Sequence, residues 1–222
     1  MAIYAWSLLP NHFHLFVRTD GESLSGVMRR VLTGYAVSFN RRHRRVGHLF
    51  QNRFKSILVE EEAYFLQLVR YIHLNPLRVR LVRDVGKLDS WLWSGHSVLM
   101  GQVERPWQTV DYVLRQFGRR AGRARRKYRD FVLDGVGKGR RPDLVGGGLI
   151  RSIGGREAAV PLGRGREKWA YDERVLGSSD FVERVWKEVE QSPLVPTASR
   201  DQRQAEVDRL VVQIADRLRL SR

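Results

Sequence analysis

The chain has 222 residues, no cysteine, and 40 Lys and Arg against 24 Asp and Glu, which gives a formal net charge of +16 at pH 7. The absence of cysteine excludes a disulfide scaffold and a zinc–thiolate site. There is no charged-then-apolar leader and no apolar run of roughly 18 residues, so we expect a cytoplasmic protein with no membrane contact. The positive charge favours nucleic acid as the partner, although a merely basic, solvated surface would have the same composition.

The first predicted element is a strand that ends in the sequence LPNHFHLFV, residues 9–17. Side chains alternate between the two faces of a strand, so His12 and His14 should point the same way and bring two imidazoles to one point. The opposite face, directed into a core, would carry Phe13, Leu15 and Val17. The alternative for a His-x-His pattern is a half-buried strand whose histidines are hydrogen-bonded or exposed.

A helix is predicted next, capped by Ser23 and with apolar residues every three or four positions that cover one face of the sheet. These residues are Leu24, Val27, Met28, Val31, Tyr35 and Phe39. A basic loop follows, and it leads to a predicted strand over residues 47–59 with basic and polar side chains on one face. A basic loop beside a basic strand face predicts a groove for a nucleic-acid backbone. The candidate DNA-binding residues are Arg41, Arg42, Arg44, Arg45, Gln51, Arg53 and Lys55.

The next predicted helix covers Glu61 to Asn75, with Phe65, Leu68, Val69 and Ile72 as its core stripe. Positions i and i+4 share a helix face, so Tyr71 and Asn75 should be presented together. Pro76 is expected to end the helix at Asn75. A hydroxyl and an amide oxygen would then meet the imidazole pair, although a tyrosine on an amphipathic helix is also a common core or boundary residue.

The chain divides into three predicted regions. Residues 1–101 form the first, which closes on DSWLWSGHSVLMG, where the tryptophans are read as packing residues and His96 as an ordinary residue. Residues 102–165 form a basic helical and Gly-rich connection, with a helical stretch from Pro106 to Gly118. The sequence GRRAGRARRKYRDF then predicts either an amphipathic basic helix or a contact with the DNA backbone. Glycine, proline and arginine are frequent from Gly135 to Gly165, which predicts a linker.

Residues 166–222 are predicted to be a small helical region. Asp180 with Glu183 would make a capping box for a helix through Glu190, and Ser199 with Gln202 would make another. The second of these helices carries one apolar stripe, which consists of Val207, Leu210, Val211, Ile214 and Leu218.

Three strings carry a resemblance to a known family: LPNHFHLFV, GHLFQNRFKSILVE and RYIHLNPLRVRLV, in this order within about a hundred residues. Together they resemble the single-tyrosine HUH transposases, and most closely the REP-associated tyrosine transposases of bacteria. The resemblance implies an α+β fold in which helices pack on an antiparallel sheet of the HUH, ferredoxin-like kind. It also implies that His12, His14 and Asn75 hold a divalent metal and that Tyr71 is the nucleophile. Such proteins usually have a strand and a helix ahead of the residues that match Trp6, so we expect an N-terminal truncation.

The implied chemistry needs these residue types. A free tyrosine has a pKa near ~10 and is a poor nucleophile at neutral pH without help, and a cation on a phosphate oxygen makes phosphorus more electrophilic. Two imidazoles and one amide leave positions for water and phosphate oxygens, which suits Mg²⁺ or Mn²⁺ better than a structural zinc. The predicted reaction is metal-dependent cleavage and transfer of single-stranded or hairpin DNA, such as palindromic repeats, through a phosphotyrosine intermediate.

Two other functions stay open at this point. One is a catalytically weak or inactive remnant that binds a hairpin, and the other is a metal-dependent phosphoesterase that uses water and leaves Tyr71 structural. The sequence also leaves open whether the protein is a monomer or a homodimer in which Tyr71 serves the metal site of the partner.

Overall fold

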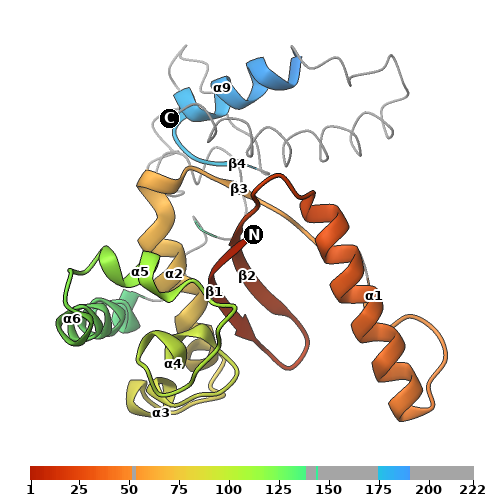
Figure 1. Cartoon of the computed structure of the whole chain (residues 1–222), viewed down its shortest axis with the longest axis horizontal. Helices are drawn as coiled ribbons and strands as arrows, with labels where there is room; N and C mark the ends of the chain where they lie inside the picture. The colour runs from red at the N-terminus through yellow and green to blue at the C-terminus, as the bar shows by residue number, and fades with distance from the viewer. Residues whose placement is uncertain (52–53, 139–143, 145–174, 191–222) are drawn as a thin grey trace, which may run out of the picture.

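A computed structural model of the chain describes residues 1–51, 54–138, 144 and 175–190 (Figure 1). An N-terminal hairpin, β1 (Ala2–Leu8) and β2 (Phe13–Arg18), is followed by the helix α1 (Leu24–His43), the short strand β3 (Leu58–Val59) and the helix α2 (Glu61–Arg78). Four helices come next: α3 (Val85–Asp89), α4 (Gly95–Leu99), α5 (Val110–Arg115) and α6 (Ala121–Leu133). A 3₁₀ turn (Val136–Lys138), the strand β4 (Val175–Leu176) and the helix α9 (Ser179–Glu190) complete the described elements. None of the described helices is long and apolar enough to cross a membrane.

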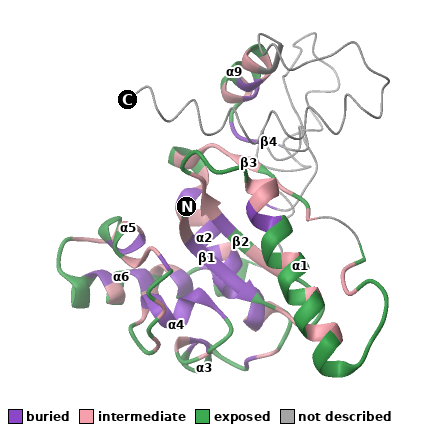
Figure 2. Cartoon of the chain, turned by 45° about the vertical axis from the view of Figure 1, so that its right-hand side comes forward, coloured by how far each residue is buried: buried purple, intermediate pink, exposed green. Residues whose placement is uncertain are grey.

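The antiparallel hairpin packs against α2, which confirms the predicted α+β class. β1 and β2 pair with Ser7 opposite His14, and they form a two-stranded sheet. An aromatic cluster joins the hairpin to the helix: the Tyr4 ring lies 5.7 Å from the Phe16 ring and 5.1 Å from the Phe65 ring, centroid to centroid. Figure 2 shows buried residues in this hairpin and α2, and also in α4, α5 and α6. The predicted core stripe of α2 is confirmed, since Phe65, Leu68, Val69 and Ile72 are all buried.

The predicted faces of the histidine strand are wrong. Leu15 is 38% exposed, whereas Phe16 is 9% exposed, so the covered face is the one that carries His14 and Phe16. The reason is the position of α2, which lies against that face and brings Phe65 on to Phe16, with ring centroids 5.4 Å apart. His14 is therefore half-buried beneath a helix instead of facing away from the core.

The helix α1 extends further than predicted and covers little of the sheet. Only Val27 and Met28 of its apolar residues are buried, while Val31 is 52% and Tyr35 57% exposed. Figures 1 and 2 show α1 leading away from the hairpin with most of its surface exposed. The helix continues through the predicted basic loop because positive side chains are favourable at the negative end of the helix dipole, and it ends at Arg44, whose φ is 51°.

The predicted strand over residues 47–59 is also wrong for most of its length. Of the residues in this range that the structure describes, only Leu58 and Val59 are in a strand, and this strand pairs in parallel with β4 instead of joining the histidine hairpin. Gly47 has a φ of 95°, a backbone conformation outside the strand region. Without a neighbouring strand to pair with, the alternating side chains of this segment do not specify a sheet face.

The helix α2 passes through Pro76, where it was predicted to end at Asn75. Proline removes one backbone donor and disfavours a helical residue before it, yet Val79 N donates to Asn75 O at 3.0 Å and Leu81 N to Pro76 O at 2.8 Å. The last turn keeps these bonds because its apolar side is buried, with Leu74 1% exposed. The extra turn places Arg78 at the end of the helix.

Segments beyond Asn75 pack on the same core. The Trp6 Nε1 group donates to Gln108 Oε1 at 2.7 Å, and Gln108 Nε2 donates to Gly95 O at 3.1 Å. The core cluster includes residues of α5 and α6 together with those of the hairpin and α2. α6 is the amphipathic basic helix that was one of the two predictions for its sequence: it buries Ala124, Tyr128 and Val132. The helical stretch predicted from Pro106 to Gly118 is shorter, and forms α5.

The helix α9 begins two residues earlier than the predicted capping box implies. Phe181 N donates to Ser178 Oγ at 3.3 Å, so Ser178 caps the helix and Asp180 lies in its first turn. The predicted helix from Ser199 and most of the Gly-rich stretch from Gly135 to Gly165 lie outside the described residues.

A buried polar network connects α2 to α3, α4 and α6. His73 Nδ1 and His96 Nδ1 lie 2.8 Å and 2.7 Å from Tyr128 Oη, and all three side chains are fully buried. His96 Nε2 donates to Asp89 Oδ1 at 2.9 Å, and Arg129 Nε donates to Asp89 Oδ2 at 2.8 Å. A neutral imidazole has a single N–H, so His96 Nδ1 accepts from the Tyr128 hydroxyl, and the Tyr128 oxygen accepts from His73 Nδ1–H.

This network predicts a loss of stability in acid. Burial lowers the pKa of His96 from its ordinary value, although the hydrogen bond and charge of Asp89 act in the opposite direction. Because the unfolded chain binds this proton more readily than the folded one, the free energy of unfolding should fall as the pH drops below about 6.5. Urea unfolding at pH 7.5 and pH 5.5 measures the difference.

His96→Gln is the variant that tests this assignment. It should lower the free energy of unfolding at pH 7.5 by about 1–3 kcal/mol, because Tyr128 and Asp89 lose a buried partner, and it should also reduce the dependence of stability on pH. A His96→Gln protein with the same pH dependence as the wild type would show that His96 is not the group responsible.

Candidate functional site

Two histidines lie together at the start of β2. The rings of His12 and His14 are 5.0 Å apart, centroid to centroid, and nearly perpendicular. His12 is exposed in the turn before the strand, and its Nδ1 lies 2.7 Å from Asn11 Oδ1. Because an amide oxygen can only accept a hydrogen bond, His12 Nδ1 carries the proton and Nε2 keeps its lone pair. The predicted convergence of the two imidazoles is therefore present, with Asn11 as an orienting residue that the sequence did not indicate.

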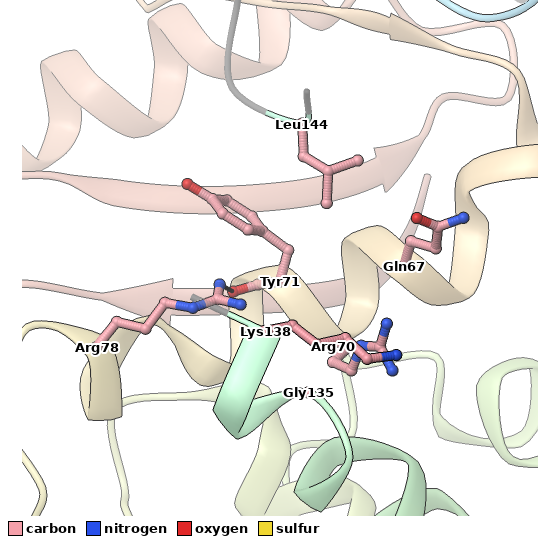
Figure 3. Close-up of a pocket in the computed structure, with 7 residues that line it drawn as sticks. All are labelled: Gln67, Arg70, Tyr71, Arg78, Gly135, Lys138 and Leu144. Carbon is pink, nitrogen blue, oxygen red and sulfur yellow. Dashed lines mark hydrogen bonds between the residues drawn. The ribbon is translucent and has the colours of Figure 1, made fainter. Parts of the chain in front are cut away.

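Tyr71 lies against this pair. Its ring centroid is 6.1 Å from that of His14, with the two rings nearly perpendicular. Tyr71 is half-buried on α2, and in Figure 3 its ring extends from the helix toward the strands, with the hydroxyl at the far end. The helix and the hairpin of one chain thus bring the predicted nucleophile and the two predicted histidine ligands to one place.

Asn75 lies one helical turn after Tyr71 and is 6% exposed. Its side-chain nitrogen is buried and makes no hydrogen bond among the described residues. A buried side-chain amide whose nitrogen has no hydrogen-bond partner is uncommon. The Asn75 nitrogen therefore does not fix the orientation of the side chain. Asn75 shares the helix face of Tyr71, which keeps it available as the third ligand of the predicted site.

The donor set fits a divalent cation that retains open coordination positions. Burial lowers the pKa of His14, and the nearby His12 lowers it further, so His14 is neutral at physiological pH, which is the form that binds metal. No group of three or more His, Cys, Asp or Glu side chains in the described ranges could hold a metal ion. A metal here would therefore depend on two imidazoles, the Asn75 amide and external oxygens, which suits Mg²⁺ or Mn²⁺.

The predicted DNA-binding residues are not in this immediate site. Arg41 and Arg42 lie in the last turn of α1, and Arg44 and Arg45 follow it directly, all of them exposed. Gln51 and Lys55 are exposed and outside any strand, and Arg53 lies outside the described residues. The arginines of α1 and its C-terminal cap form an exposed basic end of the helix, whereas the described members of the predicted strand face, Gln51 and Lys55, are not in a strand.

Sequence reasoning missed a cation beside Tyr71. Arg78 is two turns after Tyr71 on α2: its guanidinium carbon lies 5.0 Å from the centre of the Tyr71 ring, and its Nη1 donates to Tyr71 O at 3.1 Å. The helix was predicted to end at Asn75, so Arg78 was not considered as a neighbour of Tyr71. Two residues seven positions apart lie on the same face only where the helix continues through both of them. Tyr71 and Arg78 line a small pocket with Gln67, Arg70, Gly135, Lys138 and Leu144 (Figure 3).

A family model matches the N-terminal part of the chain. The model of the family described as "Transposase IS200 like" matches residues 1–75, a range that contains both histidines, Tyr71 and Asn75. No curated protein and no solved structure matches the chain.

Replacing either histidine should weaken the binding of a divalent metal. We expect His12→Ala and His14→Ala each to weaken Mn²⁺ binding by more than about tenfold, since even the outer-shell partners of metal ligands contribute that much. Titration calorimetry and the Mn²⁺ electron paramagnetic resonance signal measure this directly. His48→Ala, at another exposed histidine, is the matched control, and unchanged Mn²⁺ affinity in both site variants would contradict the assignment.

Proposed function

We propose that this chain, in which residues 1–75 form an IS200-like transposase domain of the HUH single-tyrosine family, cleaves and transfers DNA strands through a covalent bond to Tyr71. The observation that carries the proposal is the position of the Tyr71 ring, 6.1 Å from His14, while His14 lies 5.0 Å from His12. A nucleophile next to a metal-binding pair is the arrangement that phosphoryl transfer to a tyrosine requires.

In the proposed reaction, His12, His14, Asn75 and Tyr71 have different roles. His12, His14 and Asn75 would hold the cation, which supplies charge neutralisation at a non-bridging phosphate oxygen. The Tyr71 oxygen forms a bond to phosphorus while the bond from phosphorus to one DNA oxygen breaks. The Tyr71 proton is lost to solvent, and the departing DNA oxygen takes up a proton and becomes a free hydroxyl. Because the phosphotyrosine keeps a phosphodiester, a second DNA hydroxyl can displace Tyr71 and rejoin the strand.

The support for tyrosine over water as the nucleophile is local. Tyr71 is half-buried and pointed toward the hairpin, and its ring is stacked by Arg78. The Arg78 guanidinium on the Tyr71 ring and its hydrogen bond to the Tyr71 carbonyl oxygen support the orientation of this side chain, and a fixed orientation is what a positioned nucleophile requires. A phosphoesterase that used water would leave this arrangement without a role.

Tyr71→Phe decides between the candidate functions. Incubated with a single-stranded hairpin DNA and Mn²⁺, the wild-type protein should form a DNA adduct that survives denaturation and maps to Tyr71 by mass spectrometry. Tyr71→Phe should bind the hairpin as before and form no adduct, because it loses one oxygen and little packing. Tyr64→Phe, at a second tyrosine of α2, is the matched control and should keep the adduct.

Each other outcome identifies one of the alternatives. Cleavage without an adduct would favour the phosphoesterase that uses water. Hairpin binding with neither cleavage nor adduct would favour the inactive DNA-binding remnant.

We also propose that Tyr71 acts at the metal site of its own chain, because both lie together within one chain. A mixture of Tyr71→Phe and His14→Ala proteins should then form no adduct. If the protein instead forms dimers in which Tyr71 serves the partner, the mixture would restore adduct formation, since one composite site would be intact.

The exposed basic end of α1 is the proposed contact for the DNA backbone, with Gln51, Arg53 and Lys55 as further candidates in the segment that follows. Hairpin binding should weaken with salt, with a log–log slope of about 0.7 per neutralised phosphate on single strands. The triple variant Arg42→Gln, Arg44→Gln, Arg45→Gln should flatten this slope by up to about two units. An unchanged slope, measured by fluorescence anisotropy, would show that these arginines only face solvent.

A further inference from the structure

The exposed end of α1 carries a row of aromatic rings. Tyr35, Phe39 and His43 follow one another at four-residue spacings, so they share one face of the helix. The Tyr35 and Phe39 ring centroids are 6.0 Å apart, and those of Phe39 and His43 are 4.2 Å apart. Tyr35 is 57% exposed, and Figure 2 shows this end of the helix as mostly exposed. Aromatic surface left open in this way is typical of a site that binds a partner.

The chain that follows α1 holds this row in place. Arg45 N donates to Asn40 O at 2.9 Å, and Asn40 Nδ2 donates to Gly47 O at 2.9 Å. The chain is thereby turned back along the helix, and Phe50 packs on Tyr35 with ring centroids 6.2 Å apart. The rings are therefore ordered before any ligand arrives, which lowers the entropic cost of binding one.

The charge around the row is positive and has no acidic partner. Residues 24–59 contain no Asp or Glu. Near the start of α1, Arg30 pairs with Glu22 at 3.3 Å, but at its end no arginine forms an ion pair with another described residue. The guanidinium carbon of Arg45 lies 5.9 Å from the centre of the Phe39 ring, so charge and ring are in contact. The four arginines at this end, all exposed, are Arg41, Arg42, Arg44 and Arg45.

Unpaired nucleotides match this combination of rings and uncompensated charge. Each nucleotide carries one phosphate charge and one base with a flat apolar face, and proteins bind such strands with cations and aromatic rings together. In a duplex the bases are stacked on one another and are not available to a ring. A second copy of the chain fits less well, because two such helix ends would place like charges face to face.

We propose that the end of α1 binds unpaired nucleotides of DNA, with bases stacked on Tyr35 and His43 and phosphates on the four arginines. The choice of DNA rests on the proposed function, in which the chain acts on single-stranded or hairpin DNA. The proposal goes beyond a contact with the backbone, because stacking distinguishes nucleotides whose bases are free from those that are paired. This end of α1 would therefore bind the loop or the single-stranded arm of a hairpin in preference to its stem.

A comparison of strands with and without bases tests the proposal. An oligothymidylate of about eight nucleotides, within the site size of single-strand binding proteins, is compared with an abasic strand of the same length, which keeps the phosphates. Dissociation constants are measured by fluorescence anisotropy without divalent metal. The wild type should bind the oligothymidylate about tenfold or more tightly than the abasic strand, as expected for one or two stacked bases. Tyr35→Leu should weaken binding of the oligothymidylate by about tenfold and leave binding of the abasic strand unchanged.

Two further variants separate stacking from apolar surface and from folding. Tyr35→Phe keeps the ring and should bind both strands as the wild type does. Val37 is 62% exposed on the same helix, but residues two positions apart do not share a face, so Val37→Ala should also leave both affinities unchanged. Leucine favours a helix at least as well as tyrosine, and circular dichroism should show the same helix content in every variant.

The other outcomes would overturn the proposal. Equal weakening on both strands by Tyr35→Leu would show that the ring acts through the fold, and unchanged affinity would show that it contacts no base. Tighter binding of the corresponding RNA strand would overturn the assignment to DNA. A wild-type dimer that Tyr35→Asp converts to a monomer, measured by sedimentation, would assign this face to a second copy of the chain.

These results can be distinguished from a failure of the proposed function. If the wild type forms an adduct at Tyr71 but Tyr35→Leu binds both strands as the wild type does, only the inference about α1 is wrong. If the base-dependent loss is found but no adduct forms, the stacking site stands and the strand transferase does not. A wild type that binds neither strand would overturn the stacking site, and the adduct assay on the hairpin would still decide the proposed function.

Discussion

The contact between the β1–β2 hairpin and α2 is the constraint on which the site depends. Tyr4 and Phe16 from the hairpin meet Phe65 from the helix in one aromatic cluster, and burying each such side chain contributes about 1.5–3 kcal/mol. Phe16 and His14 lie on the same covered face of β2, and Phe65 and Tyr71 both lie on α2. The packing that stabilises the fold therefore also fixes the separation between Tyr71 and the histidines, and a shift of the helix along the strand would separate them.

The second support of this geometry comes from chain beyond the domain that matches the transposase family. His73, between Tyr71 and Asn75 in sequence, donates to Tyr128 on α6, and Tyr128 donates to His96 on α4. Burial lowers the pKa of His73 well below its ordinary value, and the nearby His96 lowers it further, so the imidazole is neutral in the core. A buried neutral network has a low tolerance for displacement, because each lost partner leaves an unsatisfied polar group. α6 thereby holds the far side of α2 while its other face presents arginines to solvent.

The features of the fold and of the candidate site that could be predicted from the sequence are those that depend on residues close together in the chain. The His-x-His pair, the helix with Tyr71 and Asn75, and the core stripe of α2 all follow from short-range periodicity and are present. The predicted inward face of β2 was wrong, because alternation defines two faces but does not say which one a distant helix will cover. The strand over residues 47–59 failed for a related reason, since strand propensity has effect only where a neighbouring strand is present. The Tyr128 network could not have been found, because it joins residues 55 and 32 positions apart.

Pro76 has the largest consequence of these differences. The rule that a helix ends before proline describes an average cost, and in α2 the buried apolar side of the last turn outweighs it. Because the helix continues, Arg78 lies on the same face as Tyr71. In a helix that ended at Asn75, this face would carry only the Tyr71 ring and the Asn75 amide. The guanidinium carbon of Arg78 lies 5.0 Å from the centre of the Tyr71 ring, a separation at which a cation is attracted to an aromatic face. The sequence YIHLNPLR, residues 71–78, therefore places Tyr71, the His73 anchor to the core, the buried Asn75 amide and the Arg78 cation in two turns of one helix.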